Sequence, residues 1–406
     1  MSVLEIRACQ DEEEQRQFRW LVRYVFANNK QDEADLEGQG IQPAWTNCGF
    51  IDGRVVTTMA ALPFRAKLNG ATVRMAGVTC VGTSPAHRRM GIMRKVMTSS
   101  LARWRDEGNA FAILWASMGS IYQRFGYGLA STHVKYSFDP AAIAFARDIP
   151  TPGTIQHGDA AGMFDTLREV FDRAVADRNL VIQRSRALWN TEPLQQKDGG
   201  PVFAALYRDV DGVPQGYVIY RQRDVPQDDA GRGIEIDIRD LWWTTIEAYR
   251  AVWQFILGHD LANRVALDGV VPEDDPLPHL VLEQRLLHRR TSDGIWLRVL
   301  DVREALGQRP YGESGALSIA IEGDDMCPWN NGVYTIESAE GGQAVSPGGA
   351  PVITTSPNGL ASLIAGHASA SQLSRWGMLD FADEASLLKA DRWFATKHRP
   401  HGPDHF

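Results

Sequence analysis

The chain has 406 residues, 44% of them hydrophobic and 23% charged, so it is long enough for two to four domains and too apolar to be disordered by default. Its formal net charge of −8 disfavours nucleic acid and anionic membranes as partners, and it weakly favours cationic, amine-bearing molecules. Four scattered cysteines without a C-x-x-C pair disfavour a disulfide framework and a structural zinc site, so we expect no metal.

The first third of the chain alternates between strand and helix patterns, and it begins without a signal-peptide layout. Hydrophobic periodicity predicts helices at 11–27 and 91–107 and strands at 3–8, 55–62, 71–81, 110–116 and 134–138. Asn69-Gly70 is a turn signal between two of these strands, and Gly108 ends the second helix. A linker with two prolines, 148–153, closes this part of the chain.

The rest of the chain repeats the mixture of strands and helices. The middle third predicts a hairpin of 202–207 with 215–220, strands at 234–238 and 265–270, and a helix at 245–257. The last third begins near 296–300, with strands at 317–321 and 332–337 and helices at 359–365 and 382–394. Because no apolar run approaches the ~20 residues of a membrane span, we expect a cytoplasmic protein.

A basic helix entrance is the segment that carries chemistry. His87, Arg88 and Arg89 lie where a strand turns into the second predicted helix, and the helix macrodipole disfavours exposed cations there by ~0.3–1 kcal/mol each. Such cations are expected if an anion docks, because the N–H groups of the first turn, Met90 to Arg94, can bind a pyrophosphate. Gly91 lets the backbone approach the phosphates closely. A solvated basic turn is the alternative.

This entrance and a second motif resemble a known family. Arg88-Arg89-Met90-Gly91-Ile92-Met93 is similar to the acetyl-CoA loop R/Q-x-x-G-x-G/A of GNAT acetyltransferases, with Met93 in place of the last Gly or Ala. The segment 121–128, I-Y-Q-R-F-G-Y-G, resembles the I-Y-x-R-F-G-Y-G hallmark of the Eis (enhanced intracellular survival) family. Further landmarks at 275–280 and 293–298 extend the resemblance over essentially the whole chain, to an aromatic last residue, Phe406.

The resemblance implies a three-domain α/β (α+β) architecture. Two tandem GNAT-like domains would be followed by a sterol-carrier-protein-like domain, with boundaries at 1–145, 146–300 and 301–406. The first domain would bind acetyl-CoA and catalyse. The second lacks the CoA loop and would act as a scaffold, and the third would deliver the chain terminus to the active site. By family analogy the chain would assemble as a homohexamer.

The resemblance also implies the reaction, an acetyl transfer from acetyl-CoA to an amine by direct attack in a ternary complex. Tyr127 would be the general acid and the carboxylate of Phe406 the general base. The backbone N–H of Val81 would polarise the thioester, and Val81, Gly82 and Thr83 would pair with the pantetheine arm. The remaining residues implied at the cofactor are Arg88, Arg89, Met90, Gly91, Ile92, Met93 and Arg94 at the pyrophosphate, and Tyr122 and Gln123 beside the CoA arm.

The acceptor stays open between several amines, of a small molecule or of a lysine side chain. The best-known family members acetylate aminoglycosides in an acidic pocket, but here His405 replaces a glutamate, with Asp404 before it. Asn28 and Asn29 stand where an acid is expected, followed by Asp32, Glu33 and Asp35. A polyamine or an aryl amine fits equally, and the aromatic candidates for the acceptor site are Phe64, Trp45 and Trp115.

Two alternatives to this acetyltransferase remain. One is a non-catalytic protein of the same fold that binds a lipid or a protein partner through its third domain. The other is an acyltransferase that prefers longer acyl groups. The last stretch, 398–406, is polar and turn-rich, and taken alone it is typical of a frayed tail.

Overall fold

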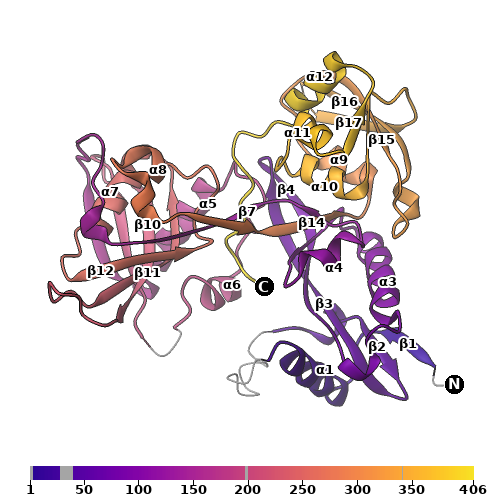
Figure 1. Cartoon of the computed structure of the whole chain (residues 1–406), viewed down its shortest axis with the longest axis horizontal. Coiled ribbons are helices and arrows are strands. Elements are labelled where there is room, and N and C mark those ends of the chain that lie inside the picture. The colour runs from indigo at the N-terminus through magenta and orange to yellow at the C-terminus, as the bar shows by residue number, and fades with distance from the viewer. Residues whose placement is uncertain (1–2, 28–39, 197–199, 341) are drawn as a thin grey trace.

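The computed structural model describes residues 3–27, 40–196, 200–340 and 342–406. Three β-sheets organise the molecule, and helices pack against them (Figure 1), which confirms the predicted mixed α/β class. The predicted amide and acidic candidates for the acceptor pocket, Asn28, Asn29, Asp32, Glu33 and Asp35, lie outside the described residues.

The first sheet has seven strands in the order β1-β2-β3-β4-β5-β14-β6. Its β3 and β4 form a hairpin through Asn69 and Gly70, both with positive φ, so the predicted turn is confirmed. The elements of this unit are β1 (Leu4–Arg7), α1 (Glu12–Val25), β2 (Cys48–Ile51), β3 (Arg54–Leu68), β4 (Ala71–Thr83), α3 (Ile92–Asp106), β5 (Phe111–Trp115), α4 (Gly119–Gln123), β6 (Gly128–Leu129) and β14 (Ile295–Val299).

The third strand is longer than the sequence predicts. It continues past Leu62 to Leu68 and includes Pro63, which pairs with Ala76 of β4. Beyond Thr57, β3 has no residue paired with β2, and isolated bridges of Ala60 with Thr46 and of Ala66 with Ile182 cover that side. Proline is tolerated between these bridges because no ladder hydrogen bond is lost there.

The second sheet also has seven strands, in the order β13-β7-β12-β11-β10-β9-β8. The predicted β9–β10 hairpin and the helix after β11 are confirmed, and Thr245 caps that helix by accepting from the Ala248 N–H. The elements are β7 (Thr132–Phe138), β8 (Thr154–Asp159), α5 (Phe164–Ala174), α6 (Arg186–Thr191), β9 (Phe203–Arg208), β10 (Pro214–Asp224), β11 (Ile234–Trp243), α7 (Ile246–Leu257), β12 (Ala262–Asp268), α8 (Leu277–Leu280) and β13 (Arg290–Asp293).

Two strands cross between the first two sheets. β7 follows β6 in the chain but lies in the second sheet, whereas β14 follows β13 and inserts between β5 and β6 of the first. All five residues of β14 are buried, as expected for a central strand. The chain therefore enters the second sheet before the predicted boundary at 145, and β14 returns to the first sheet before the predicted boundary at 300, because periodicity indicates a strand without indicating its partner.

The third unit is a five-stranded sheet in the order β17-β16-β15-β18-β19 with four helices. Its elements are α9 (Val302–Gln308), β15 (Gly315–Ile321), β16 (Gly332–Ala339), β17 (Gly342–Pro347), β18 (Ile353–Thr355), α10 (Pro357–Ile364), α11 (Ala370–Arg375), β19 (Leu379–Phe381) and α12 (Glu384–Phe394). Within the described ranges, no helix is both long and apolar enough to cross a membrane.

The first sheet buries a different core on each face. On one face α3 packs Val96, Leu101 and Trp104 against the sheet. On the other face a single apolar cluster runs from Ile113 of β5 to Leu360 of α10. Because this second cluster is continuous, a shared core fixes the third unit on the first sheet.

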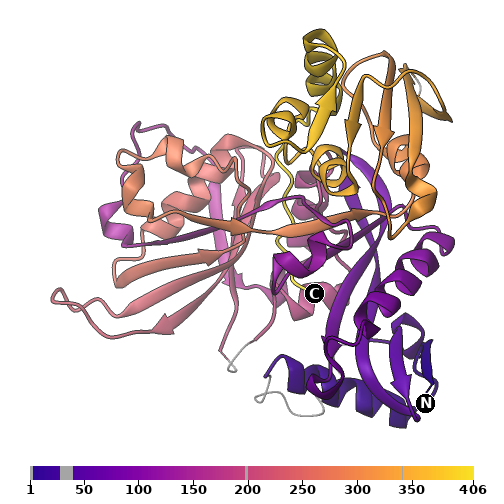
Figure 2. The ribbon, with the colours of Figure 1, turned by 45° about the vertical axis from the view of Figure 1, so that its right-hand side comes forward.

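The last residues leave the third unit and run between the first two sheets, where the carboxyl end lies near the centre of the molecule (Figures 1 and 2). His401 is 4% exposed and Asp404 is 1% exposed. The tail is therefore packed, and the alternative of a frayed tail is wrong.

Candidate active site

The parallel strands β4 and β5 pair over only three residues and then separate. Their last pair joins Gly77 to Ile113. Beyond it β4 carries a bulge, because one residue of β3 faces two of β4, Cys80 and Val81, and Cys80 has a φ of 56°. The predicted pantetheine-binding residues Val81, Gly82 and Thr83 thus lie on the part of β4 that has no β5 partner.

The entrance of α3 is shaped as an anion-binding turn. Arg89 and Gly91 have φ values of 64° and 75°, and α3 begins at Ile92 without a side-chain cap. Residues with positive and negative φ alternate here, and the first helical turn has no side-chain cap. This geometry directs several backbone N–H groups to one side. An added Cβ at Gly91 would meet nothing within 4 Å, so this position requires glycine for its φ and not for space.

The basic side chains of this turn are exposed, as a phosphate-binding role requires. Arg88, Arg89 and Arg94 are all exposed, and Met90 between them is 61% exposed. The Nε of Arg88 donates to the carbonyl oxygen of Thr83 at 3.2 Å, which ties the guanidinium to the end of β4. The pyrophosphate residues predicted from sequence are therefore contiguous in space.

Tyr127 is fully buried, and its hydroxyl has no hydrogen-bond partner among the residues that the structure describes. Burial raises the pKa of this hydroxyl well above its ordinary value, and the nearby charge of Arg298 acts in the opposite direction. The hydroxyl is thus a protonated donor at neutral pH. The hydroxyl is therefore able to donate to a ligand atom, as a general acid must.

A residue of the third unit hydrogen-bonds to the backbone of Tyr127. The side-chain amide of Asn358, on α10, donates to the carbonyl oxygens of Tyr127 at 2.7 Å and of Gln123 at 2.9 Å. Gly128 permits this approach, because an added Cβ would lie 2.1 Å from the Asn358 carbonyl oxygen. Tyr122 is also buried, with its ring centroid 5.8 Å from that of Tyr127, whereas Gln123 is exposed.

The strand register aligns Tyr127 with the separation of β4 and β5. Gly77 pairs with Ile113, Ile113 with Leu297, and Leu297 with Gly128. Tyr127 precedes the last residue of this row. The tyrosine and the first unpaired residues of β4 therefore lie at one level of the sheet.

The carboxyl-terminal tail reaches the same level from the other side. Trp115, the last residue of β5, donates from Nε1 to the Asp404 carbonyl at 2.9 Å and stacks on the His405 ring at 4.1 Å. The Phe406 ring meets Phe64 edge to face. Phe64 and Trp115, two of the aromatic acceptor-site candidates, therefore contact the tail.

Tyr127 and Phe406 lie on opposite faces of the first sheet. Tyr127 belongs to the apolar cluster under α3, and Phe406 packs against the cluster on the opposite face. Between them β4 and β5 have separated, beyond Gly77 and Ile113, and this break in the strand pairing is here called the gap.

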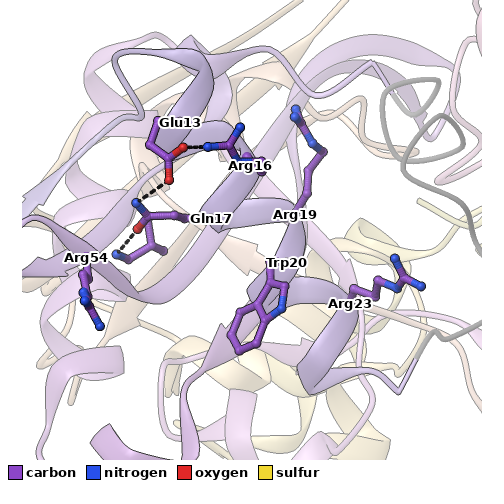
Figure 3. Close-up of a pocket in the computed structure, with 8 residues that line it drawn as sticks. Glu13, Arg16, Gln17, Arg19, Trp20, Arg23 and Arg54 are labelled. Atoms are coloured by element: carbon purple, nitrogen blue, oxygen red, sulfur yellow. Dashed lines mark hydrogen bonds and ion pairs between the residues drawn. The ribbon is translucent and has the colours of Figure 1, made fainter.

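Other candidates lie elsewhere. Trp45 is the last residue of a short 3-10 turn. The carbonyl oxygens on either side of it accept hydrogen bonds from Arg103, near the carboxyl end of α3. These contacts do not link Trp45 to the tail. A hollow of about 590 Å³ between α1 and β3 (Figure 3) includes none of the predicted cofactor residues. In it Arg16 pairs with Glu13, and the other lining residues include Arg19, Trp20, Arg23 and Arg54.

The sequence did not point to two groups that shape the site, Asn358 and the buried Arg184, which pairs with Asp404. An Asn directly before a predicted helix is typical of an ordinary helix start, and a lone Arg is typical of the surface. Within the described residues, no group of three or more His, Cys, Asp or Glu could hold a metal ion.

Comparison with known proteins divides the chain in the same way. Residues 5–130 and 180–299 each match the family described as acetyltransferase (GNAT) domain, and residues 302–403 match the sterol carrier protein domain. The first match ends just before β7 enters the second sheet. The predicted order of two GNAT domains and a sterol-carrier-protein-like domain is confirmed.

The chain is similar to named acetyltransferases over most of its length. The N-acetyltransferase Eis of Mycobacterium tuberculosis is 29% identical, over 89% of this chain and 91% of the relative. An uncharacterized N-acetyltransferase of Streptomyces avermitilis is 28% identical, over 90% and 89%. The crystal structure of Eis1 from Mycobacterium abscessus has a TM-score of 0.85 at 27% identity, covering 99% of this chain and 100% of that one. The chain is therefore an acyltransferase with two GNAT acetyltransferase domains, similar over most of its length to the N-acetyltransferase Eis.

Proposed function

We propose that the protein transfers an acetyl group from acetyl-CoA directly to an amine, with Tyr127 as general acid and the Phe406 carboxylate as general base. One observation carries the proposal: the tyrosine and the terminal residue lie on opposite faces of the first sheet, beside the gap between β4 and β5. Direct transfer fits this arrangement, because the attacking nitrogen and the leaving sulfur are different substituents of the tetrahedral carbon, and each needs its own proton acceptor or donor.

The nitrogen loses two protons and the sulfur gains one. The Phe406 carboxylate takes the first proton from the acceptor ammonium and passes it to solvent, and the neutral nitrogen then forms a bond to the thioester carbonyl carbon. The same carboxylate takes the second N–H proton as the carbon–sulfur bond breaks. The Tyr127 hydroxyl gives its proton to the sulfur, and the tyrosinate is reprotonated from solvent. The Val81 N–H would donate to the carbonyl oxygen as negative charge develops there.

The two groups need different pKa values. A free α-carboxyl titrates near ~3.3–3.7, below the pKa that suits a general base at neutral pH. The raised pKa of the buried Tyr127 keeps its hydroxyl protonated until the thiolate forms. The environment of Tyr127 therefore favours its role as an acid.

The turn before α3 would hold the cofactor. Its exposed Arg88, Arg89 and Arg94 would pair with the pyrophosphate, beside the backbone N–H groups of Met90 to Met93. Buried Tyr122, next to Tyr127, and exposed Gln123 would lie beside the CoA arm. Cytoplasmic location stays a prediction from the sequence, and a hexamer stays a prediction from the family.

The acceptor would be the amine of a small molecule or of a lysine. Release of CoA tests this with a panel of an aminoglycoside, a polyamine, a lysine peptide and an aryl amine, with propionyl-CoA as a competing donor. We expect turnover with at least one amine, and its loss when Phe406 is deleted from a folded protein. Acetyl-CoA binding without turnover on any amine would contradict the enzyme proposal in favour of a binding protein.

A further inference from the structure

The second sheet repeats the opening of the first. Its parallel strands β11 and β12 pair only as far as Ile238 and Leu267. Just beyond, β11 carries a bulge at Arg239, because Tyr220 pairs with Ile238 while Ile219 already pairs with Asp240. Helix α7 follows β11 as α3 follows β4. The second unit therefore retains the gap that the first unit offers to its cofactor.

The chain's own tail lies across this second gap. The His401 side chain hydrogen-bonds through Nε2 to the carbonyl oxygen of Val270, just past the end of β12, at 3.1 Å. Its ring lies 5.9 Å from that of Trp242, on the end of β11 that has no β12 partner. The tail thus reaches both β11 and the segment after β12, beyond the last pair of these strands.

A buried arginine joins the tail to this gap. Arg184 donates to both carboxylate oxygens of Asp240, at 2.6 and 3.0 Å, and its Nε donates to Asp404 at 2.8 Å. All three side chains are no more than 1% exposed. Asp240 is further fixed by hydrogen bonds from the Tyr217 hydroxyl and from Trp242 Nε1. One planar guanidinium therefore binds the second sheet and the tail together.

The segment that carries Arg184 is also attached to the first sheet. The Gln183 N–H donates to the Arg65 carbonyl on β3 at 2.8 Å, and the Lys67 N–H of β3 donates to the Val181 carbonyl at 2.8 Å. Arg65 is the neighbour of Phe64, on which the Phe406 ring packs. Arg184 is therefore connected to Phe64 in two ways, through the tail residues Asp404 to Phe406 and through the backbone of β3.

We infer that Arg184 and Asp240 are positioning residues, which clamp Asp404 so that the carboxylate of Phe406 is aimed at the first active site. The gap of the second unit thus serves as a socket for the tail and not as a cofactor site. This inference rests on the proposed role of Phe406 as the base. Neither residue touches the reacting atoms, so their effect is on the orientation of the base.

The experiment compares Asp404→Asn with the wild-type protein, both with a native carboxyl terminus. The variant removes the charge that Arg184 grips and leaves the Arg184–Asp240 pair intact, which favours folding. We expect kcat to fall about 10- to 100-fold while KM for acetyl-CoA stays within about twofold. Carboxypeptidase A, followed by mass spectrometry, should release Phe406 faster from the variant.

Two further variants make the test specific. Asp240→Asn should give the same changes without altering the tail sequence. Asp237→Asn is the matched control, since Asp237 lies on the same strand and accepts from Arg221 and Arg223 at 2.7 Å, away from the tail. Asp237→Asn should leave kcat and the release of Phe406 at wild-type values.

The outcomes separate the two proposals. If deletion of Phe406 abolishes turnover but Asp404→Asn and Asp240→Asn keep wild-type kcat and release rates, the base assignment stands and the clamp is overturned. If deletion of Phe406 leaves turnover intact, the base assignment fails and the clamp's catalytic role fails with it. A matching fall in both variants, with intact thermal stability, supports the clamp.

Discussion

The rings of Phe64 and Phe406 meet edge to face, with centroids 4.9 Å apart, and join the middle of the first sheet to the last residue of the chain. Phe64 lies over Gly77, the last β4 residue that pairs with β5. An added Cβ at Gly77 would lie 2.2 Å from the Phe64 ring. The lack of a side chain at Gly77 therefore allows the Phe64 ring to lie close to β4, where it contacts the Phe406 ring.

Gly77→Ala should lower kcat about tenfold by displacing the Phe64 ring and with it Phe406. Overpacking should also cost about 1–3 kcal/mol of folding free energy. Steady-state kinetics and thermal unfolding measure both effects. Gly158→Ala is the control, since an added Cβ there meets nothing within 4 Å. A Gly77→Ala protein with wild-type kcat would show that the position of the Phe64 ring does not affect catalysis.

Tyr127→Phe should lower kcat about 10²–10⁴-fold with little change in acetyl-CoA affinity, because only proton donation to the sulfur is lost. Its stability should be unchanged or slightly higher, since the hydroxyl leaves no described partner behind. Tyr136→Phe is the control. It should lower the stability and leave kcat unchanged, because the Tyr136 hydroxyl donates to buried Asp275 at 2.9 Å. A Tyr127→Phe enzyme that turns over normally but melts early would make this tyrosine structural.

Local patterns predicted the elements and the phosphate turn, because each depends on neighbouring residues. The Arg88 to Met93 loop and the glycine at the α3 start are examples. The exchange of β7 and β14 could not be predicted, since pairing depends on residues far along the chain. Likewise Arg184 and Asp404 are 220 residues apart, and neither carries a local signal for the other.

A double variant, Arg88→Gln with Arg89→Gln, should raise KM for acetyl-CoA about 100-fold or more and leave kcat at saturation nearly unchanged. Charge-assisted hydrogen bonds to phosphate are worth about 1.5–3 kcal/mol each, and both would be lost in the bound state. Because the arginines are exposed, added salt should weaken wild-type binding and shrink the difference.

The control for this pair is Arg303→Gln, an exposed arginine of α9 outside the turn. It should leave KM within about twofold of wild type while changing a charge of the same kind. An equal rise in KM for both proteins would indicate a general charge effect and not a phosphate site.

His401 should make the protein sensitive to acid. Burial lowers its pKa to about 3, against ~6.5 for an exposed histidine. Between these values the unfolded chain binds a proton that the folded chain excludes, so the free energy of unfolding falls as pH decreases below ~6.5, by at most about 1.4 kcal/mol per pH unit. Asp404 acts oppositely, because burial raises its pKa to about 6 and the folded state takes up its proton as pH falls from there.

His401→Gln isolates the histidine, because glutamine can still donate to the Val270 carbonyl but does not titrate. The contribution of Asp404 is present in both proteins and cancels in their difference. The melting temperature should therefore drop less for the variant than for wild type between pH 7.5 and 5.5. Exposed His279→Gln should follow wild type. Parallel pH profiles for wild type and His401→Gln would mean that the tail leaves its socket before His401 is protonated.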